Sequence, residues 1–125
     1  MPKILLVEDN EANRDMLRRR LQRKGYSVII AEDGEQGYSL ALSEKPDLIL
    51  MDISLPAMSG WEVAQLLKAN EATRHIPIIV LTAHALLNDR AKVCEIGCSG
   101  YETKPIDFGR LTQKIEALVT ENKPA

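Results

Sequence analysis

The sequence predicts an α/β protein in which helices cover both faces of a doubly wound, five-stranded parallel sheet. Its 125 residues suit one compact domain. Four short aliphatic runs without polar alternation begin at residues 4, 28, 48 and 78, and such runs are typical of strands that are covered on both faces. The segments between them are long enough for crossover helices and carry helical apolar spacing. Alternating strands and helices therefore predict a three-layer α/β/α fold.

The predicted strands are the runs at residues 4–7, 28–31, 48–51 and 78–81, each rich in Ile, Val or Leu. A fifth strand at 100–103 is weaker, with one large apolar residue, and we expect it at the sheet edge. Five strands with right-handed crossovers favour the flavodoxin-like order 2-1-3-4-5, in which strands 1 and 3 flank the topological switch point.

Each intervening segment shows an apolar stripe at helical spacing. Gly25 and Gly97 stand where helices should stop, as does Pro46. The stripes consist of Met16, Leu17 and Leu21; Tyr38, Ala41 and Leu42; Val63, Ala64 and Leu67; Leu87, Ala91 and Cys94; and Phe108, Leu111, Ile115, Leu118 and Val119.

Composition excludes several classes of protein. Apolar residues make up 45% of the chain and charged residues 27%, a balance typical of a globular protein. The longest aliphatic run is too short for a membrane span or a secretory signal. Sixteen basic and eighteen acidic residues give a net charge of −2, which argues against direct nucleic-acid binding. Cys94 and Cys98 lack zinc or disulfide spacing, so we expect small buried side chains in a reduced, cytoplasmic protein.

Polar residues follow four of the predicted strands, at the edge where ligands bind in such sheets. They are Glu8 and Asp9 after the first strand, Asp52 after the third, Thr82 after the fourth and Lys104 after the fifth. Three clustered acids repel one another unless a cation compensates, and oxygen ligands without His or Cys suit Mg²⁺ better than Zn²⁺. A carboxylate beside Mg²⁺ can act as a nucleophile toward phosphorus, with Lys104 and Thr82 stabilising the phosphoryl oxygens.

Each of these residues alone has a simpler interpretation. Asp9 or Asn10 could cap the first helix, and Asp52 could form an Asx-turn at a strand end. A single Thr after a strand carries little information, and an isolated Lys is typical of a solvated surface. The combination of all five at one edge of the sheet favours a functional site.

The ordered motifs identify a family. They are ILLVEDN at residues 4–10, DLILMD at 47–52, LPAMSG at 55–60, IIVLTA at 78–83 and GCSGYETKP at 97–105. With them the chain resembles the receiver domain of two-component response regulators over about residues 3–120, and most resembles the single-domain members of the chemotaxis and DivK types.

The resemblance implies a role for each matching residue. Asp52 would be the phosphoacceptor, taking a phosphoryl group from a phosphohistidine on a sensor histidine kinase or histidine phosphotransfer protein. Asp9, Asp52 and the backbone carbonyl of Ser54 would bind Mg²⁺ directly, with Glu8 acting mostly through water; Mn²⁺ can replace Mg²⁺. Thr82 would hydrogen-bond the phosphoryl group and Lys104 would pair with it.

The resemblance also implies a switch. The Thr82 hydroxyl would move toward the phosphoryl group and the Tyr101 ring would turn inward, which changes the partner-binding surface of the fourth helix, fifth strand and fifth helix. Composition alone is equally consistent with a half-buried edge-strand Tyr. The resemblance further implies a cis Lys104–Pro105 peptide, whereas the sequence alone fits a trans Pro that starts the last helix near Asp107.

Other positions support weaker interpretations. Ser54 and His84 flank the route of an attacking water, although His84 more simply exposes its ring at a helix start. Trp61 is expected in the core near the metal loop, where it could report Mg²⁺ optically. The first helix has six basic residues, which we interpret as a solvated face, with docking to an acidic kinase surface as the alternative; they are Arg14, Arg18, Arg19, Arg20, Arg23 and Lys24.

Three other classes fit less well. A Mg²⁺-dependent phosphatase or dehalogenase with an aspartyl nucleophile typically has a second acid two residues later, where this chain has Ser54. A flavin or nucleotide carrier needs a Gly-, Ser- or Thr-rich phosphate loop, but the first strand ends in Glu8-Asp9-Asn10-Glu11. A degenerate binding-only receiver would have lost at least one of the five site residues.

We therefore expect one receiver domain at residues 1–120 and a short tail at 121–125, too short for an output domain. Such a protein would signal by binding other proteins, as a monomer or weak dimer, without contact with nucleic acid or membrane. Its chemistry would be limited to its own phosphorylation and dephosphorylation, so we do not expect a turnover enzyme.

Overall fold

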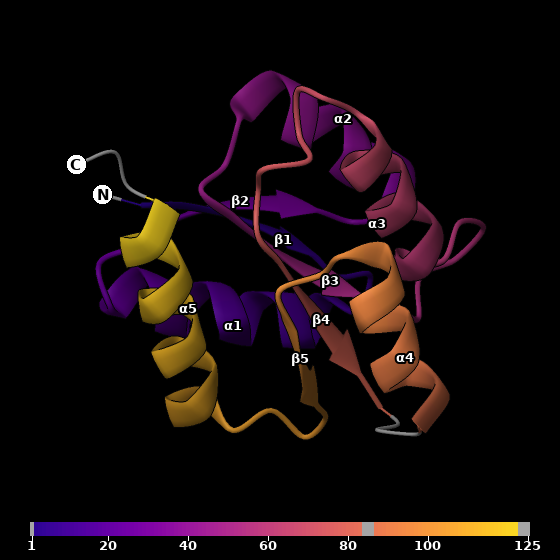
Figure 1. The fold of residues 1–125 in the computed structure, drawn as a ribbon. Coiled ribbons are helices and arrows are strands. Elements are labelled where there is room, and N and C mark those ends of the chain that lie inside the picture. The colour runs from indigo at the N-terminus through magenta and orange to yellow at the C-terminus, as the bar shows by residue number, and fades with distance from the viewer. Residues whose placement is uncertain (1, 84–86, 123–125) are drawn as a thin grey trace.

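The chain folds as a five-stranded parallel sheet between two layers of helices (Figure 1). The computed structural model describes residues 2–83 and 87–122, with side chains described as far as 83 and from 91 to 119. The elements are β1 (Lys3–Val7), α1 (Glu11–Arg23), β2 (Ser27–Ala31), α2 (Gly34–Glu44), β3 (Leu48–Asp52), α3 (Gly60–Ala69), β4 (Ile78–Thr82), α4 (Leu87–Ile96), β5 (Gly100–Thr103) and α5 (Phe108–Asn122).

The strand order is β2-β1-β3-β4-β5, and every neighbouring pair is parallel. This confirms the predicted fold class and order. The register places Val7 opposite both Ala31 and Met51, so β1 lies between β2 and β3. Because β1 and β3 are neighbours, the residues that follow them meet at one edge of the sheet.

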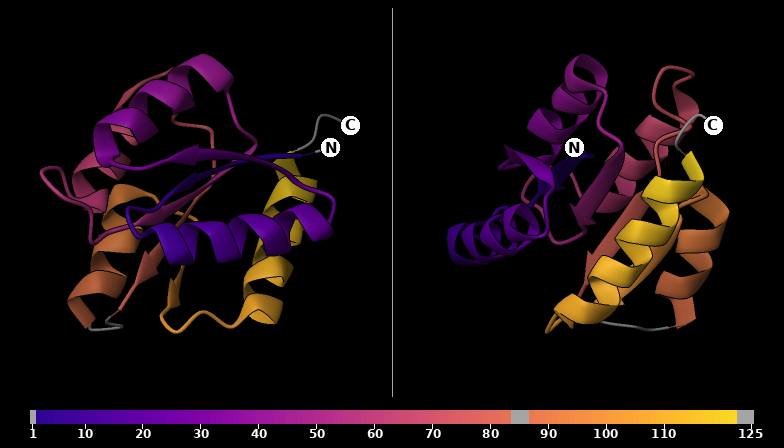
Figure 2. Two further views of the ribbon diagram at one scale, coloured as in Figure 1. Left: turned by 180° about the vertical axis from the view of Figure 1, so that it is seen from behind. Right: turned by 90° about the vertical axis from the view of Figure 1, so that its left-hand side faces the viewer.

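Two cores lie on opposite faces of the sheet, and Figure 2 shows the layers from two further sides. Alternate residues of each strand point to opposite faces, which explains the uninterrupted aliphatic runs. Leu5, Ile49 and Val80 pack with α2, α3 and α4 on one face. Leu6, Leu50 and Leu81 pack with α1 and α5 on the other.

The outer strand β2 differs from the expectation that all four aliphatic runs are covered on both faces. Its residues Val28, Ile29 and Ile30 are only half-buried, whereas every residue of β3 and β4 is buried. An edge strand has a neighbour on one side only, so its side chains retain more contact with solvent.

Two predicted apolar stripes are partly wrong. Met16 on α1 is 41% exposed, although Leu17 and Leu21 are buried. On α4 the buried residue is Val93, whereas Ala91 and Cys94 are exposed, and the side chain of Leu87 lies outside the described residues. The expectation that both cysteines are buried therefore fails for Cys94, while Cys98 is half-buried.

The helices end as the sequence predicts. Gly25 and Gly97 have φ angles of 95° and 92°, a conformation that glycine adopts at little cost after a helix. Pro46 follows the C-cap of α2, Lys45, whose φ is 48°. None of the helices in the described part of the chain combines the length and the apolar surface that a bilayer span requires.

Candidate metal centre

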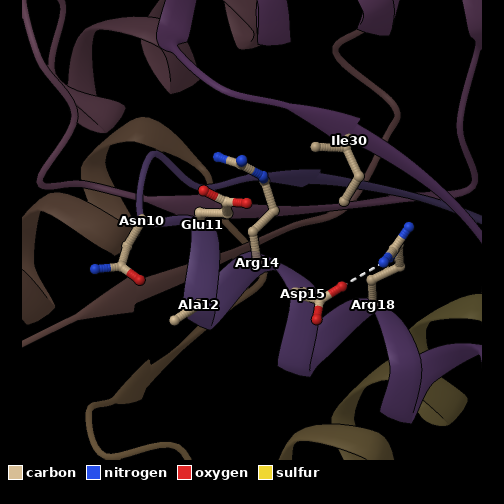
Figure 3. Close-up of a pocket in the computed structure, with 7 residues that line it drawn as sticks. All are labelled: Asn10, Glu11, Ala12, Arg14, Asp15, Arg18 and Ile30. Carbon is tan, nitrogen blue, oxygen red and sulfur yellow. Dashed lines mark hydrogen bonds and ion pairs between the residues drawn. The ribbon is translucent and has the colours of Figure 1, made fainter.

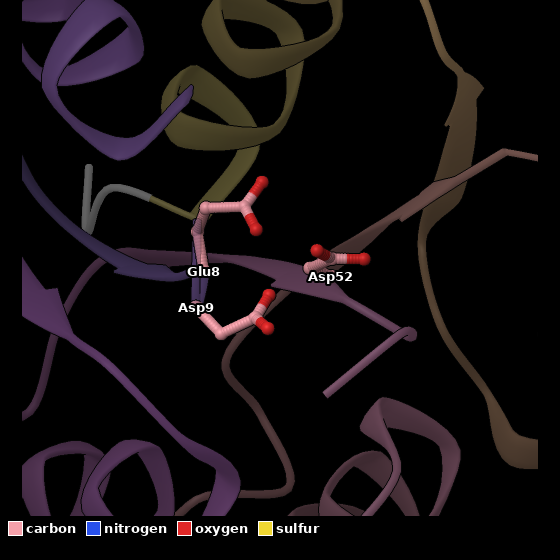
Figure 4. A group of neighbouring side chains, drawn as sticks. All are labelled: Glu8, Asp9 and Asp52. Carbon is pink, nitrogen blue, oxygen red and sulfur yellow. The ribbon is translucent and has the colours of Figure 1, made fainter. Parts of the chain in front are cut away.

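Three carboxylates converge where β1 and β3 end. Glu8 and Asp9 follow β1, and Asp52 is the last residue of β3. One ligand oxygen from each lies within 4.8 Å of the others, and the three side chains point toward a common space (Figure 4). The structure thus brings together the acids that the sequence analysis placed at this edge.

Local hydrogen bonds explain why the first two acids face the site. The backbone N–H of Glu8 donates to the Ala31 carbonyl at 3.1 Å, which extends the strand pairing by one residue. Asn10 is the N-cap of α1, because its side chain accepts the Asn13 N–H at 3.0 Å. Since Asn10 caps the helix, the carboxylate of Asp9 is left for the acidic cluster.

Asp52 has two hydrogen-bonded oxygens. Its Oδ1 accepts the Ser54 N–H at 3.0 Å, which is the Asx-turn considered from the sequence, and its Oδ2 accepts from the Lys104 ammonium at 3.0 Å. Asp52 is 1% exposed. Asp52 therefore forms the Asx-turn with one carboxylate oxygen and contacts the Lys104 ammonium with the other.

Lys104 supplies positive charge to the acids. Its Nζ lies 3.5 Å from Glu8 Oε1 as well as 3.0 Å from Asp52 Oδ2. Its backbone N–H donates to the Thr82 carbonyl at 2.7 Å, which ties the end of β5 to the end of β4. The following Lys104–Pro105 peptide is cis, the isomer that the resemblance implied, and the side chain of Asp107 caps α5 by accepting the Arg110 N–H.

Burial and charge shift the pKa values of this group. Burial, reinforced by a hydrogen bond and charge repulsion from Asp52, raises the pKa of Glu8 to about 7. Burial also acts to raise the pKa of Asp52, but hydrogen bonds from Glu8, Ser54 and Lys104 outweigh it and lower the value. Burial disfavours the Lys104 ammonium, yet its interactions with Asp52 and Glu8 raise its pKa. Without a metal, the carboxyl with the raised pKa is thus Glu8, while the pKa of Asp52 stays low.

The donor set fits Mg²⁺. All three side chains offer carboxylate oxygens, which hard divalent cations prefer. Within the described residues, the buried Oε1 of Glu8 accepts no hydrogen bond, although Lys104 lies 3.5 Å away. A buried carboxylate oxygen with spare capacity beside two further acids is an arrangement that a cation would stabilise.

The remaining predicted residues occupy nearby positions. Thr82 is the last residue of β4 and is 1% exposed. Tyr101 on β5 is half-buried against the core that includes α3 and α4, and stands opposite Val80 in the sheet. Ser54 is exposed in the loop after Asp52, and His84 lies outside the described residues.

Gly60 shapes the loop after Asp52 in a way that the sequence analysis did not assign. A Cβ atom on Gly60 would lie 2.4 Å from the Asp52 carbonyl oxygen and 2.6 Å from the Ile53 Cα. The Gly60 N–H donates to the Ile53 carbonyl at 3.2 Å. Only glycine allows α3 to begin this close to the end of β3. The signal was present in the LPAMSG motif, but a single glycine does not reveal which backbone it contacts.

The helix after Gly60 places Trp61 as expected. Its ring is half-buried against the core, and the Lys92 ammonium lies 5.6 Å from the ring centroid. This cation–π contact joins α3 to α4.

The basic residues of α1 are not uniformly solvated. The carboxylate of Asp15 pairs with Arg18 and Arg19, and the guanidinium of Arg20 stacks on Phe108 at 5.4 Å. The side chain of Arg14 is only 14% exposed. The expectation of a solvated face is therefore wrong for Arg14.

The fold and the acidic site together define a phosphoacceptor domain class. Residues 4–116 match the model of the response regulator receiver domain. The polar-differentiation response regulator DivK of Brucella anthropi is 42% identical over 120 residues, covering 95% of this chain and 98% of that protein. DivK of Brucella ovis is 41% identical over 116 residues, covering 93% and 94%.

Solved structures agree with this assignment. The receiver domain of a sensor histidine kinase from Pseudomonas aeruginosa, which has a magnesium ion coordinated in its active-site cleft, is 35% identical with a TM-score of 0.87, covering 95% of this chain and 98% of that one. The Vibrio cholerae chemotaxis protein CheY4 is 27% identical with a TM-score of 0.89, covering 94% and 98%. The chain belongs to the response regulator receiver domain family, which acts in two-component signal transduction.

Proposed function

We propose that Asp52 is the phosphoacceptor of this receiver domain and that the phosphoryl donor is a phosphohistidine on a sensor histidine kinase or a histidine phosphotransfer protein. The observation that carries the proposal is the position of Asp52, which is buried between the other two acids and the Lys104 ammonium. An oxygen of Asp52 attacks phosphorus, a P–O bond forms, and the P–N bond of the donor breaks. The electron pair returns to the imidazole, which takes a proton from solvent.

The chain's own residues position and neutralise the reacting groups. Asp9, Asp52 and the Ser54 carbonyl would hold Mg²⁺ directly, Glu8 would contribute through water, and Mn²⁺ would be able to substitute. When bound, the ion supplies positive charge to the acids and to the phosphoryl oxygens. Lys104 leaves Asp52 Oδ2 to pair with a phosphoryl oxygen, and the Thr82 hydroxyl donates to another. The protein turns over no substrate other than its own phosphoryl group.

A groove beside the site is suited to the donor protein. It has a volume of about 290 Å³, lies between α1 and the loop after β5, and includes Glu8 and Lys104 in its lining. Met16, Pro105 and Ile106 form part of its apolar lining. An apolar surface next to a charged centre suits a helix that presents a phosphohistidine.

The output of the domain is a change of partner affinity. Thr82 and Tyr101 couple the charge at Asp52 to the surface of α4, β5 and α5, which binds a downstream protein in the cytoplasm. Replacing Tyr101 by Ala should preserve phosphorylation but remove the difference in partner affinity between the two states. Equal partner affinity of the wild type with and without phosphate would contradict this switch.

Intact-mass spectrometry after incubation with Mg²⁺ and acetyl phosphate or phosphoramidate tests the phosphoacceptor. The wild type should gain the mass of one phosphoryl group, and Asp52→Asn should not. Asp33→Asn is the matched control, because Asp33 caps α2 through a bond to the Gln36 N–H that Asn can also make. An adduct that persists in Asp52→Asn, or its absence from the wild type, would refute the proposal.

A further inference from the structure

Arg14 connects helix α1 to the backbone of the two consecutive acids. Its Nη1 donates to the Glu8 carbonyl at 3.1 Å and to the Asp9 carbonyl at 3.3 Å. Its Nη2 lies 3.2 Å from Glu32 Oε1, just after β2. From α1, one guanidinium thus contacts two other segments of the chain, the loop after β1 and the loop after β2.

The burial of Arg14 distinguishes it from its neighbours on the helix. Its side chain is 14% exposed, against 42% for Arg18 and 67% for Arg19. Arg14 and Arg18 line a pocket between α1 and Ile30 (Figure 3), which has a volume of about 770 Å³. Arg18 pairs with Asp15 within the same helix, whereas Arg14 reaches back to the loop.

The contacts of Arg14 constrain the backbone from which the metal-binding acids project. The N–H of Glu8 is bound by the Ala31 carbonyl, so Arg14 completes the hydrogen bonding of this residue's main chain. Asp9 is exposed, so the direction of its carboxylate depends on the orientation of its own peptide group. Hydrogen bonds to charged donors are stronger than neutral ones and fix geometry more tightly.

The ion pair between Arg14 and Glu32 should constrain the main chain of Glu8 and Asp9 less than the two hydrogen bonds to their carbonyls do. The Glu32 side chain is 63% exposed, and solvent screens a pair of this kind. The effect of Arg14 should therefore come from its bonds to the two carbonyls rather than from the pair with Glu32.

We propose that Arg14 is a positioning residue of the metal centre, which holds the main chain of Glu8 and Asp9 so that both carboxylates face the Mg²⁺ bound beside Asp52. This inference rests on the proposed function, because it assumes that the three acids bind Mg²⁺. Groups that orient metal ligands without touching the ion typically change metal affinity by about 10–100-fold when they are removed.

The test is the Mg²⁺ dissociation constant of the unphosphorylated protein, measured by calorimetry and by Trp61 fluorescence at pH 8. Arg14→Met keeps the aliphatic stem and should weaken Mg²⁺ binding by about tenfold or more. Arg18→Met removes an arginine from the same helix and should bind Mg²⁺ like the wild type. Glu32→Gln should also change the affinity by less than about twofold, because that pair is exposed.

Thermal unfolding without Mg²⁺ separates positioning from folding. A purely structural role predicts a lower melting temperature in Arg14→Met with an unchanged dissociation constant in the folded protein, and that result would overturn the proposal. If Arg14→Met does not fold, Arg14→Lys keeps the charge on a side chain that is one bond shorter, so its ammonium should not reach both carbonyls and Mg²⁺ binding should still weaken several-fold. Wild-type affinity in Arg14→Lys would then overturn it. Failure of the wild type to bind Mg²⁺ would refute the proposed metal site itself. Equal Mg²⁺ binding by the wild type and the Arg14 variants would refute only the positioning role of Arg14.

Discussion

Lys104 on the edge of the sheet forms an ion pair with Asp52 on the central strand, with 3.0 Å between Nζ and Oδ2. The two residues belong to the ends of β5 and β3, and β4 lies between these strands. The side chain of Lys104 therefore reaches across a whole strand to the acid. In the metal-free protein, the ammonium provides part of the positive charge that a cation would supply.

The Lys104–Asp52 pair predicts opposite effects on metal binding and on phosphorylation. Lys104→Met removes a positive charge beside the acids, so the Mg²⁺ dissociation constant should fall several-fold. The same change removes charge stabilisation of the phosphoryl oxygens, so phosphorylation by a small donor should slow by about 100-fold. Calorimetry and intact-mass kinetics measure the two effects. Weaker Mg²⁺ binding together with slower phosphorylation in Lys104→Met would contradict this role for Lys104.

The position of Glu8 in the acidic cluster predicts a pH-dependent metal affinity. The pKa of Glu8 is raised to about 7, mainly by burial, so its proton must leave before the carboxylate can serve a cation. The Mg²⁺ affinity should rise with pH up to about 7 and level off above it. Titrations between about pH 5.5 and 8.5 measure this, with Glu8→Gln as the control that should remove the pH dependence. An affinity that is flat across this window in the wild type would contradict the assignment.

The same shift affects the stability of the metal-free protein. The folded state holds a proton on Glu8 that the unfolded state releases, since the pKa is about 7 when folded and 4.5 in the reference state. The stabilisation from this group is therefore present below pH 4.5 and is lost as the pH rises to about 7. Urea unfolding without Mg²⁺ should show this loss in the wild type and not in Glu8→Gln.

The buried charge of Glu102 predicts a strong dependence on Lys114. Glu102 is 3% exposed, its Oε1 lies 2.7 Å from the Lys114 Nζ, and the same ammonium donates to the Tyr101 carbonyl at 2.7 Å. Lys114→Met leaves the carboxylate buried without its partner and should lower the free energy of unfolding by about 2 kcal/mol, less than for a fully buried pair because Lys114 is 38% exposed.

A double variant isolates the interaction between these two residues. Adding Glu102→Leu to Lys114→Met removes the unpaired charge, and should recover most of the lost stability. Urea denaturation of the four proteins in the cycle gives the coupling energy. Equal free energies of unfolding for Lys114→Met and the double variant would show that the unpaired Glu102 carboxylate is not the cause of the lost stability.

The two cysteines should differ in reactivity. Burial raises the pKa of Cys98 to about 11, so its thiolate is scarce at pH 8, whereas Cys94 is exposed on α4. Iodoacetamide should therefore modify Cys94 about 100-fold faster than Cys98 in the folded protein. Intact-mass kinetics on the wild type and on Cys94→Ser measure both rates. If Cys98 reacts equally fast in the folded and urea-unfolded protein, its burial has no chemical effect.

The strands and the acidic cluster could be predicted from the sequence because they depend on local patterns. The run at residues 48–51 is aliphatic throughout since both of its faces are buried, and parallel strands bring the residues after them to one edge. The stripe of α4 could not be predicted in the same way. Ala91 and Cys94 are small enough to be exposed at little cost, so they do not mark the buried face.

Contacts across the fold were beyond prediction from spacing alone. The sequence has six basic residues between positions 14 and 24, and nothing in their order shows that Arg14 turns toward two carbonyls. In the same way, Glu102 looks like a solvated residue of an edge strand until α5 is seen to cover it with Lys114. Such side chains are placed by the packing of helices on the sheet.

The close contact at Gly60 limits how the site can respond to a phosphoryl group. Because the start of α3 lies directly against the Asp52 carbonyl, little space is left on that side of the Asp52 main chain. We therefore expect the response to added charge at Asp52 to be carried by the opposite side of the site, where Thr82 and Lys104 are joined by a backbone hydrogen bond, and to pass from there toward β5.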